Sequence, residues 1–373
     1  MSTEMTDTLE KKEKKIKILP LIFLSLCSII FLLWCIGMIW YCSGHIDPKW
    51  KILLCAGFAG LILTLFALST IKSFFRWIAW GIMMMIAGIY LAIPPSNDRQ
   101  WCQEYSRIPW AEKVDTPDGG KKWIIHDVRD FVYRSETDFD PRYCDITVDP
   151  AHLQSLDFIV VHWDGLKSIA HTMLDFGFSD GQRLVFSVET RRDIRDIDGI
   201  FPGIYKQYEI ACVVGTESDL LRLRTDHRKE ELYLYPTNAT AEQRCTIFES
   251  LLERINQLYS EPAFYHTLTF NCTKSLLPSI RQAVKLPLSR PSYLLNGFSD
   301  FLAYKLDFLA NPQKMSFEEL KKNCHVNPVL DRQDQTDRQD YSKMIRDKYP
   351  ENIINPPEPA PEKTPAGETQ NAA

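Results

Sequence analysis

The sequence lacks the closely spaced cysteine pairs that are typical of structural zinc sites. Its ten cysteines include no CxxC or CxxxC pair, whereas structural zinc is usually held by ligands at such spacings. A structural zinc site is therefore not expected. No motif indicates a cofactor either.

The chain also has no excess of positive charge. The net charge is −5, and the basic residues form no long stripe outside the N-terminal tail. Proteins that bind nucleic acid need such a stripe to contact the phosphates. Nucleic acid is therefore excluded as an expected partner.

Three long apolar runs near the N-terminus contain no charged residue. Residues 19–41, 52–70 and 77–93 are each close to the length of a membrane-spanning helix. A cleaved signal peptide is disfavoured, because the first run is too long and two more follow it at once. We expect three transmembrane helices within residues 19–94, with the lipid bilayer as a partner.

Five lysines lie just before the first run, in KKEKKIK at residues 11–17. The positive-inside rule then places residues 1–18 in the cytoplasm. Three crossings would put the rest of the chain on the other side, so we expect a multi-pass protein of the bacterial inner membrane with a periplasmic main domain.

Residues 95–310 read as one soluble domain with short strand-like runs and one long helix pattern. The runs begin near residues 123, 131, 156, 170, 183, 208 and 232, and the helix begins near residue 241 with capping-box spacing between Thr240 and Gln243. This order predicts an α+β fold with an antiparallel sheet. Residues 311–373 are charged and then proline-rich, which predicts a disordered tail.

Cys272 is the candidate nucleophile of this domain. It lies between an extended run ending at Asn271 and a segment that has the composition of a short helix. A thiol at a helix start faces unpaired N–H groups and the positive end of the helix dipole, which favours the thiolate. The alternative is that Cys272 is an unreactive buried cysteine. Elsewhere in the domain, a disulfide between Cys102 and Cys144 is possible outside the cytoplasm.

His171 is the candidate base, with Glu189 as the residue that orients it. Alternation places His171, Met173 and Asp175 on the non-core face of a strand that turns back at Ser179–Gly181. If the hairpin is tight, facing residues have numbers that sum to about 360, which sets Glu189 opposite His171. The expected site is a Cys-His-Glu arrangement.

Several other residues remain open as alternatives. Ser187 or Asp175 can replace Glu189, and His162 or His266 can replace His171 as the base. A metal site built from His171, Cys272 and a second histidine lacks the usual ligand spacing.

Four side chains are candidates for contacts to the substrate or the oxyanion: Asn271, Ser187, Arg191 and Arg192. Asn271 can donate an amide to an oxyanion or cap the following helix. Arg191 and Arg192 can hold an anionic substrate group, or they can belong to a solvated charged turn.

The blocks HTMLDFGFSDG, FSVETRR, YLYP and FYHTLTFNCT, within residues 171–273, resemble the Lnb N-terminal periplasmic domain family over about residues 120–285. The resemblance implies a permuted papain-like thiol fold, in which a histidine on a strand precedes a cysteine at a helix start. It also implies acyl-transfer chemistry, because the family includes a lipoprotein N-acyltransferase. In that protein, unlike here, the membrane helices do not precede the domain.

The sequence thus supports a membrane-anchored thiol enzyme, either an acyltransferase or an amidase or peptidase. Lipoproteins or other envelope acyl or peptide substrates are the expected partners. The alternative is a non-catalytic binding or sensory domain on a membrane anchor.

Overall fold

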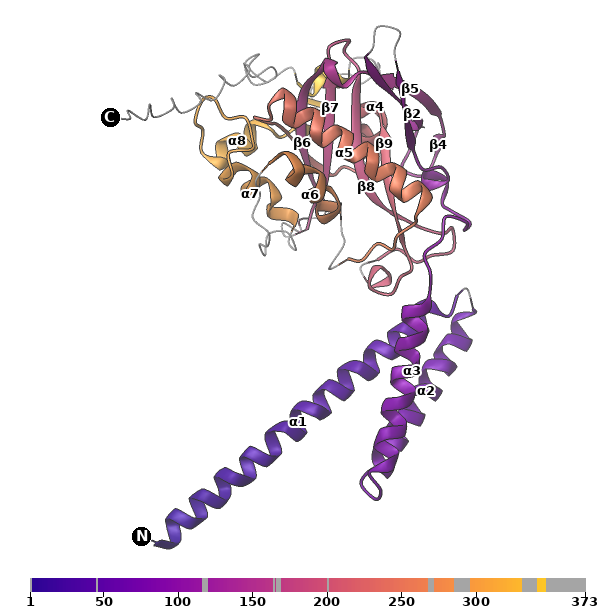
Figure 1. The fold of residues 1–373 in the computed structure, drawn as a ribbon, viewed down its shortest axis with the longest axis vertical. Helices are drawn as coiled ribbons and strands as arrows, with labels where there is room; N and C mark the ends of the chain where they lie inside the picture. The colour runs from indigo at the N-terminus through magenta and orange to yellow at the C-terminus, as the bar shows by residue number, and fades with distance from the viewer. Residues whose placement is uncertain are drawn as a thin grey trace, which may run out of the picture. The chain divides into compact units, whose positions relative to one another are not determined.

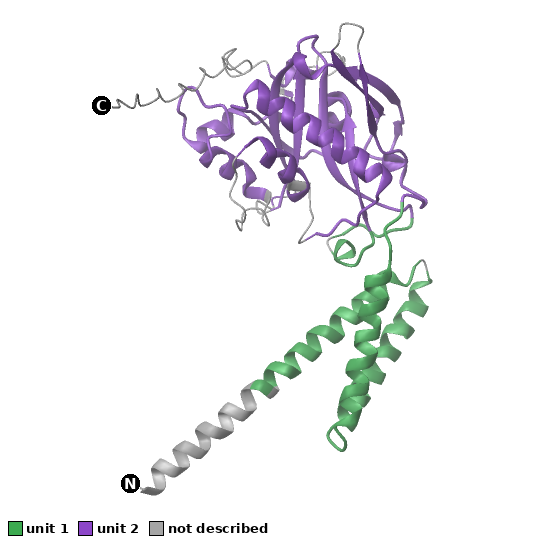
Figure 2. Ribbon diagram, in the orientation of Figure 1, with its two compact units in different colours: residues 1–96, 195–207 green, residues 97–194, 208–373 purple. Residues whose placement is uncertain are grey.

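The computed structural model describes residues 2–44, 46–115, 120–163, 165, 169–199, 201–267, 272–284, 296–330 and 341–346, with backbone only for residues 2–19, 21, 272, 273, 296 and 329. The chain divides into two compact units (Figure 2). One unit comprises Met1–Ser96 with Arg195–Gln207, and the other comprises Asn97–Ile194 with Tyr208–Ala373.

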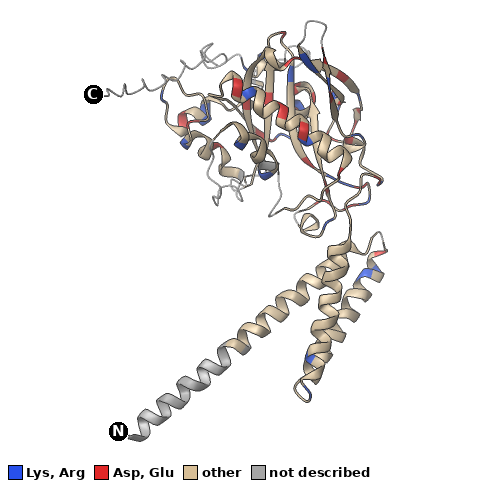
Figure 3. Cartoon of the chain, in the orientation of Figure 1, with Lys and Arg blue, Asp and Glu red and all other residues tan. Residues whose placement is uncertain are grey.

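The first unit contains three helices, α1 (Ser2–Cys42), α2 (Pro48–Leu68) and α3 (Phe74–Ala92). All three have a segment that is long and apolar enough to cross a membrane, which in α1 is Ile22–Cys42. The described parts of these helices carry few charges (Figure 3). The prediction of three apolar helices that could cross a membrane is confirmed.

The outer surface of these helices is as apolar as their contacts with one another. Side chains such as Phe23, Leu53 and Met84 are exposed, while Cys35 and Met83 are buried in the seam between helices. An exposed apolar surface of this extent is stable only in lipid. The chain is therefore a membrane-anchored protein.

The helix α2 begins four residues earlier than predicted. The side chain of Asp47 accepts a hydrogen bond from the Lys49 N–H, and Pro48 occupies the first turn. An aspartate cap followed by proline is a strong start signal even where the first turn is polar. The apolar run alone therefore placed this boundary too late.

Within the described residues of the second unit, eight strands form one sheet in the order β1-β2-β9-β8-β7-β6-β10, with β5 paired to β2 (Figure 1). These strands are β1 (Trp110–Asp115), β2 (Lys121–Arg129), β5 (Tyr143–Val148), β6 (Leu153–His162), β7 (His171–Phe178), β8 (Arg183–Arg191), β9 (Glu209–Gly215) and β10 (Glu231–Pro236). Two short strands, β3 (Val132–Tyr133) and β4 (Phe139–Asp140), pair separately. All pairs are antiparallel except that between β2 and β9, which confirms the α+β fold class with a mostly antiparallel sheet.

The strands β1 and β5 were missed by the sequence analysis. Both pair with β2 only, and most of their side chains are exposed or half-buried. Such edge strands need no apolar pattern, because they contribute little to the core.

The helix α5 (Ala241–Ser260) covers one face of the sheet with α6 (Cys272–Ala283) beside it (Figure 1). The capping box of Thr240 and Gln243 is present, as predicted. Phe248 of α5 packs edge-on against Phe176, Phe178 and Phe186. The core thus lies between these helices and the strands β7 and β8.

The opposite face of β7 and β8 is also buried, so its description as a non-core face was wrong. The alternation was predicted correctly, but Met173 and Asp175 are fully buried and His171 is 7% exposed. Asp175 contacts Arg183 and Arg346 there. The helix α4 (Glu217–Arg222) and the distant segment containing Arg346 cover this face with polar groups, which a hydrophobic pattern does not reveal.

The predicted disordered tail is ordered in part. Between residues 311 and 346, the structure contains α8 (Phe317–Asn323), α9 (Asn327–Leu330) and α10 (Tyr341–Met344), preceded by α7 (Ser299–Lys305). Leu320, Val326 and Tyr341 are buried, so these residues belong to the folded unit. Residues 347–373 lie outside the described part of the chain.

Candidate functional site

The site is organised around three side chains at one end of β7 and β8. Met173 pairs with Ser187 and Leu174 with Phe186, so the predicted register, with numbers summing to about 360, is confirmed. This register brings the first residue of β7 to β8: His171 Nε2 lies 2.7 Å from Ser187 Oγ and 3.1 Å from Glu189 Oε1. The structure therefore joins His171 to two of the three candidates named for its partner, Ser187 and Glu189.

The hydrogen bonds assign the tautomer of His171. Ser187 Oγ donates its proton to Glu189 Oε1 at 2.6 Å, so the contact between Ser187 and His171 requires a proton on Nε2. In the neutral ring the lone pair then lies on Nδ1. Nδ1 is therefore the nitrogen with which His171 would accept a proton.

Arg224 holds Glu189 from the other side. Its Nη2 lies 2.9 Å from Glu189 Oε1, and its Nη1 lies 2.9 Å from Glu230 Oε2. Burial by itself raises the pKa of Glu189, but attraction to His171 and to Arg224 outweighs it, and the pKa is well below its ordinary value. Glu189 is thus a carboxylate at neutral pH.

Arg224 and Glu230 were not identified as site residues from the sequence. Arg224 lies in a five-residue π-helical segment, Leu223–His227, directly after α4. Such segments often occur at functional sites. No local pattern in the sequence marks Arg224 as a partner of Glu189.

The helix that begins at Cys272 runs antiparallel to α5. Gln243 Nε2 at the start of α5 donates to the Ala283 carbonyl at the end of α6. Ser250 and Ser279 also share a hydrogen bond of 3.0 Å. The last residues of α6 therefore lie beside the first residues of α5.

This arrangement places the start of α6 at the His171 end of the sheet. Arg244, in the first turn of α5, donates to the Leu153 carbonyl, and Leu153 pairs with Phe178, the last residue of β7. Since α5 begins at the Phe178 end of β7, α6 ends there and begins at the opposite end. Cys272 and His171 thus start their elements at the same end of the domain.

The side chain of His171 and the helix α6 nevertheless lie on opposite faces of β7. Thr172 lies on the face against which α6 packs, together with Leu276 and Ile280. Because neighbouring residues of a strand point to opposite faces, His171 is directed toward Arg224 and away from α6. A contact between thiol and imidazole would have to form beyond the end of the strand.

Two predicted site residues lie outside what the structure describes. Asn271 is outside the described residues, and only the backbone of Cys272 is described. The prediction that a helix begins at Cys272 is confirmed. Its role as a nucleophile stays a prediction.

The predicted substrate residue Arg191 is buried in structural contacts. Its guanidinium donates to Asn97 Oδ1 at 2.9 Å and to the Tyr105 carbonyl at 3.0 Å, and it lies over the Trp101 ring. Burial lowers its pKa to about 10. The neighbouring Arg192 is half-buried, and its carbonyl accepts from the Cys102 N–H. The structure does not bring either arginine to His171.

The rival bases lie at the same end of the domain as His171. His162 is the last residue of β6, next to Val161, which pairs with His171, and its ring packs edge-on against Tyr233. By alternation, His162 lies on the same face of β6 as Phe158, which is the face covered by α6 and α7. His266 follows Tyr265, whose N–H donates to the Tyr208 carbonyl. Burial lowers the pKa of both histidines.

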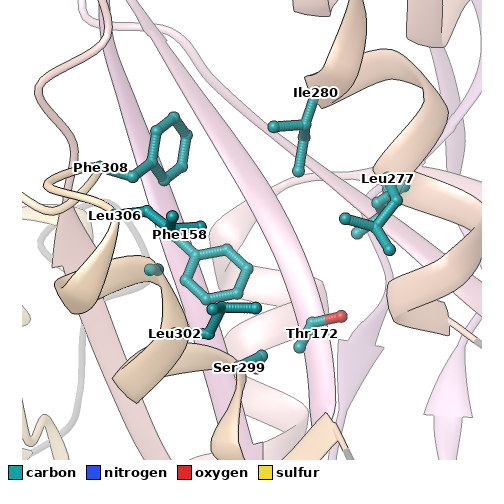
Figure 4. Close-up of a pocket in the computed structure, with 10 residues that line it drawn as sticks. Phe158, Thr172, Leu277, Ile280, Ser299, Leu302, Leu306 and Phe308 are labelled. Atoms are coloured by element: carbon teal, nitrogen blue, oxygen red, sulfur yellow. The ribbon is translucent and has the colours of Figure 1, made fainter. Parts of the chain in front are cut away.

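An apolar pocket lies between α6 and α7, with β6 and β7 as its floor (Figure 4). Phe158 and Thr172 form the floor, Leu277 and Ile280 lie on one side, and Leu302 on the other. Its empty space is about 530 Å³, part of it open to solvent. This lining fits an apolar group, such as part of a hydrocarbon chain or an apolar side chain.

Two other predicted arrangements can be compared with the described side chains. Cys102 and Cys144 are both free thiols, so the possible disulfide between them is not formed. Among the side chains that the structure describes, no group of three or more His, Cys, Asp or Glu residues could hold a metal ion.

Comparison with protein families gives one match. The model described as "Lnb N-terminal periplasmic domain" matches residues 139–297, which confirms the resemblance and includes β5 to β10, α5 and α6. Searches of curated proteins and of solved structures found no match. The matched region contains His171, Glu189, Arg224 and Cys272.

Proposed function

We propose that this membrane-anchored chain, with its Lnb N-terminal periplasmic domain, is a thiol enzyme that transfers or hydrolyses acyl groups. The observation that carries the proposal is the buried His171–Ser187–Glu189–Arg224 network at the end of the sheet where α6 begins at Cys272. A histidine whose Nε2 is fixed by a carboxylate is the arrangement that general-base catalysis requires. The permuted papain-like fold implied by the family is part of this proposal.

The proposed reaction has two steps. His171 Nδ1 accepts the proton of Cys272 Sγ, and the sulfur attacks the carbonyl carbon of an ester or amide. When the tetrahedral intermediate collapses, the proton passes from His171 to the leaving alcohol or amine, and a thioester remains. Water or an amine then attacks the thioester carbonyl, and His171 takes the proton of this nucleophile. The C–S bond breaks, the acid or amide product leaves, and His171 returns the proton to Cys272 Sγ.

The remaining residues would support this proton transfer. Glu189 stabilises the imidazolium and keeps the proton on Nε2, while Ser187 and Arg224 hold Glu189 in place. The Asn271 amide and the N–H groups at the start of α6 would stabilise the oxyanion. Arg191 and Arg192 support the fold in this proposal, because their observed contacts are structural.

The apolar pocket favours a substrate with an acyl chain over a polar peptide. Its lining is hydrocarbon apart from Thr172 and Ser299, and α6, which carries Cys272 at its start, forms one wall. Lipoproteins, or other acylated molecules of the cell envelope, are the proposed substrates. An amidase or peptidase acting on envelope peptides would use the same residues.

The proposed location is the bacterial inner membrane with a cytoplasmic N-terminus. The five lysines of residues 11–17 support this orientation through the positive-inside rule. The main domain would then be periplasmic, as the name of the matching family also indicates.

A non-catalytic binding or sensory domain is the second candidate. One observation favours it: α6 packs on the Thr172 face of β7, whereas His171 points to the other face. In that case the His171–Glu189–Arg224 network would only stabilise the sheet, and the pocket would bind an apolar ligand without chemistry.

An acyl-trapping experiment separates the two candidates. The full-length protein in liposomes is incubated with phosphatidylethanolamine that carries an alkyne at the end of its acyl chain, and the label is located by mass spectrometry. We expect a hydroxylamine-sensitive label on Cys272 that is absent from Cys272→Ala and His171→Ala. No label above the Cys272→Ala background would contradict acyl transfer from phospholipid.

A further inference from the structure

The connection between β8 and β9 contains a segment, residues 195–207, that belongs to the same compact unit as the membrane helices. We propose that this segment is a membrane-interface anchor, which inserts Ile197 and Phe201 into the lipid at the outer ends of α1 and α3. The inference is independent of the thiol chemistry proposed above.

The first contact is between Tyr205 and α1. Its ring stacks on Tyr41 at a centroid distance of 5.2 Å and lies 6.3 Å from the Trp34 ring. Gly37 allows this approach, because a Cβ at that position would be 2.2 Å from Tyr205 Oη. The Gln207 amide also donates to the Tyr41 carbonyl at 2.9 Å.

The second contact is between Lys206 and the C-terminal end of α3. Lys206 Nζ donates to the carbonyls of Tyr90 at 2.9 Å, Leu91 at 3.3 Å and Ile93 at 3.1 Å. Tyr90 and Leu91 belong to the last turn of α3 and Ile93 is its C-cap residue, and the helix dipole makes this end favourable for a cation. The Tyr90 hydroxyl donates in return to the Ile204 carbonyl.

These contacts fix the depth of residues 204–207 in the bilayer. The spans end at Cys42 in α1 and at Ala92 in α3, and both ends lie on the same side of the membrane because α2 crosses between them. The ends of spanning helices lie at the boundary between hydrocarbon and head groups. Because residues 204–207 contact the ends of both α1 and α3, they lie at that boundary.

The segment has two large apolar side chains that are mostly exposed. Ile197 is 61% exposed and Phe201 is 65% exposed, and Phe201 directly precedes the turn Pro202–Ile204. Trp50, at the start of α2 on the same side, is 62% exposed. Aromatic and apolar residues at this level are characteristic of membrane interfaces. The partner is therefore lipid.

Photocrosslinking in the full chain tests this proposal. In separate variants, p-benzoylphenylalanine replaces Phe201, Trp77 or Val114, and the proteins are reconstituted in liposomes of phosphatidylethanolamine and phosphatidylglycerol. Trp77 is an exposed residue of α3 and serves as the membrane control, and Val114 is an exposed apolar residue of β1 and serves as the control outside the first unit.

We expect lipid adducts at position 201 at a yield within a few-fold of position 77, and none at position 114. A variant at position 197 should give the same result as position 201. Absence of a lipid adduct at both 197 and 201, with adducts at 77, would overturn the proposal. An equal yield at 114 and 201 would also overturn it, because contact with lipid would then not be specific to the segment.

Discussion

Glu189 accepts hydrogen bonds through a single oxygen, Oε1, which lies 3.1 Å from His171 Nε2 and 2.9 Å from a guanidinium nitrogen of Arg224. His171 and Glu189 are held on adjacent strands by the regular β7–β8 register, and both are largely buried. The pair is therefore preorganised by the sheet.

Replacing Glu189 by glutamine should reduce both stability and thiol reactivity. The amide removes the negative charge between His171 and Arg224, and hydrogen bonds to charged groups contribute about 1.5–3 kcal/mol each. We expect the free energy of unfolding to fall by about 2 kcal/mol and Cys272 alkylation at pH 7 to slow at least about tenfold. Glu253→Gln, at an exposed position of α5, should change neither quantity. Equal effects in the two variants would contradict the role of Glu189.

Acid should lower the stability of the wild type more than that of Glu189→Gln. The pKa of Glu189 in the folded protein lies well below its ordinary value of 4.5. A carboxyl group with a lowered folded-state pKa contributes stability that is present above its unfolded pKa and is lost as the pH falls through the folded pKa. Thermal unfolding from pH 7 down to about pH 3 should therefore show a difference between wild type and Glu189→Gln that narrows below about pH 4.5. A difference that stays constant or widens over this range would contradict the depressed pKa.

Arg346 should be essential for the fold, although it lies near the end of the described chain. Its Nη2 contacts Asp157 at 3.0 Å, Asp175 at 2.7 Å and Glu217 at 2.5 Å. Arg346→Ala removes one of the two cations of this buried cluster and leaves Arg183 as the other. Breaking a buried ion pair in this way typically costs about 3–5 kcal/mol. Lys343→Ala, at an exposed position of α10, is the matched control and should cost less than about 0.5 kcal/mol. Chemical unfolding of the two variants measures the contrast, and similar stabilities would show that the cluster is not a structural requirement.

Gly37→Val should release the segment 195–207 from the membrane helices. The new side chain would occupy the space of the Tyr205 ring. We expect amide hydrogen exchange in residues 201–207 to rise by about tenfold or more, which corresponds to about 1.4 kcal/mol. Gly57→Val is the control, because beyond the neighbouring backbone of its own helix nothing lies within 4 Å of a Cβ at Gly57. Unchanged exchange in Gly37→Val would contradict the docking of Tyr205.

The parts of the fold that depend on local pattern were predictable. Three uncharged runs gave the spanning helices, the capping box gave the start of α5, and alternation with a turn at Ser179–Gly181 gave the β7–β8 register. Each of these features depends on residues that are close in sequence.

Features made by distant segments were not predictable. Arg346 contacts Asp157, which is 189 positions earlier in the chain. No local pattern could therefore predict that the second face of the sheet is buried. For the same reason, none could predict that part of the C-terminal tail is ordered. Arg224 contacts Glu189 from a π-helical segment, whose geometry follows from packing and not from composition. For the same reason, the sequence placed His171 opposite Glu189 but did not show that α6 packs on the other face of β7.

The central claim is that His171 activates Cys272, and the pH dependence of Cys272 alkylation tests it most directly. Iodoacetamide labelling of the full-length protein, read at Cys272 by mass spectrometry, is compared between wild type, His171→Ala and His162→Ala. The account predicts a wild-type thiol that is half-reactive below about pH 7, a shift toward about pH 8.5 in His171→Ala, and no shift in His162→Ala. A wild-type thiol with a pKa near 8.5, or one that responds to His162→Ala and not to His171→Ala, would contradict it.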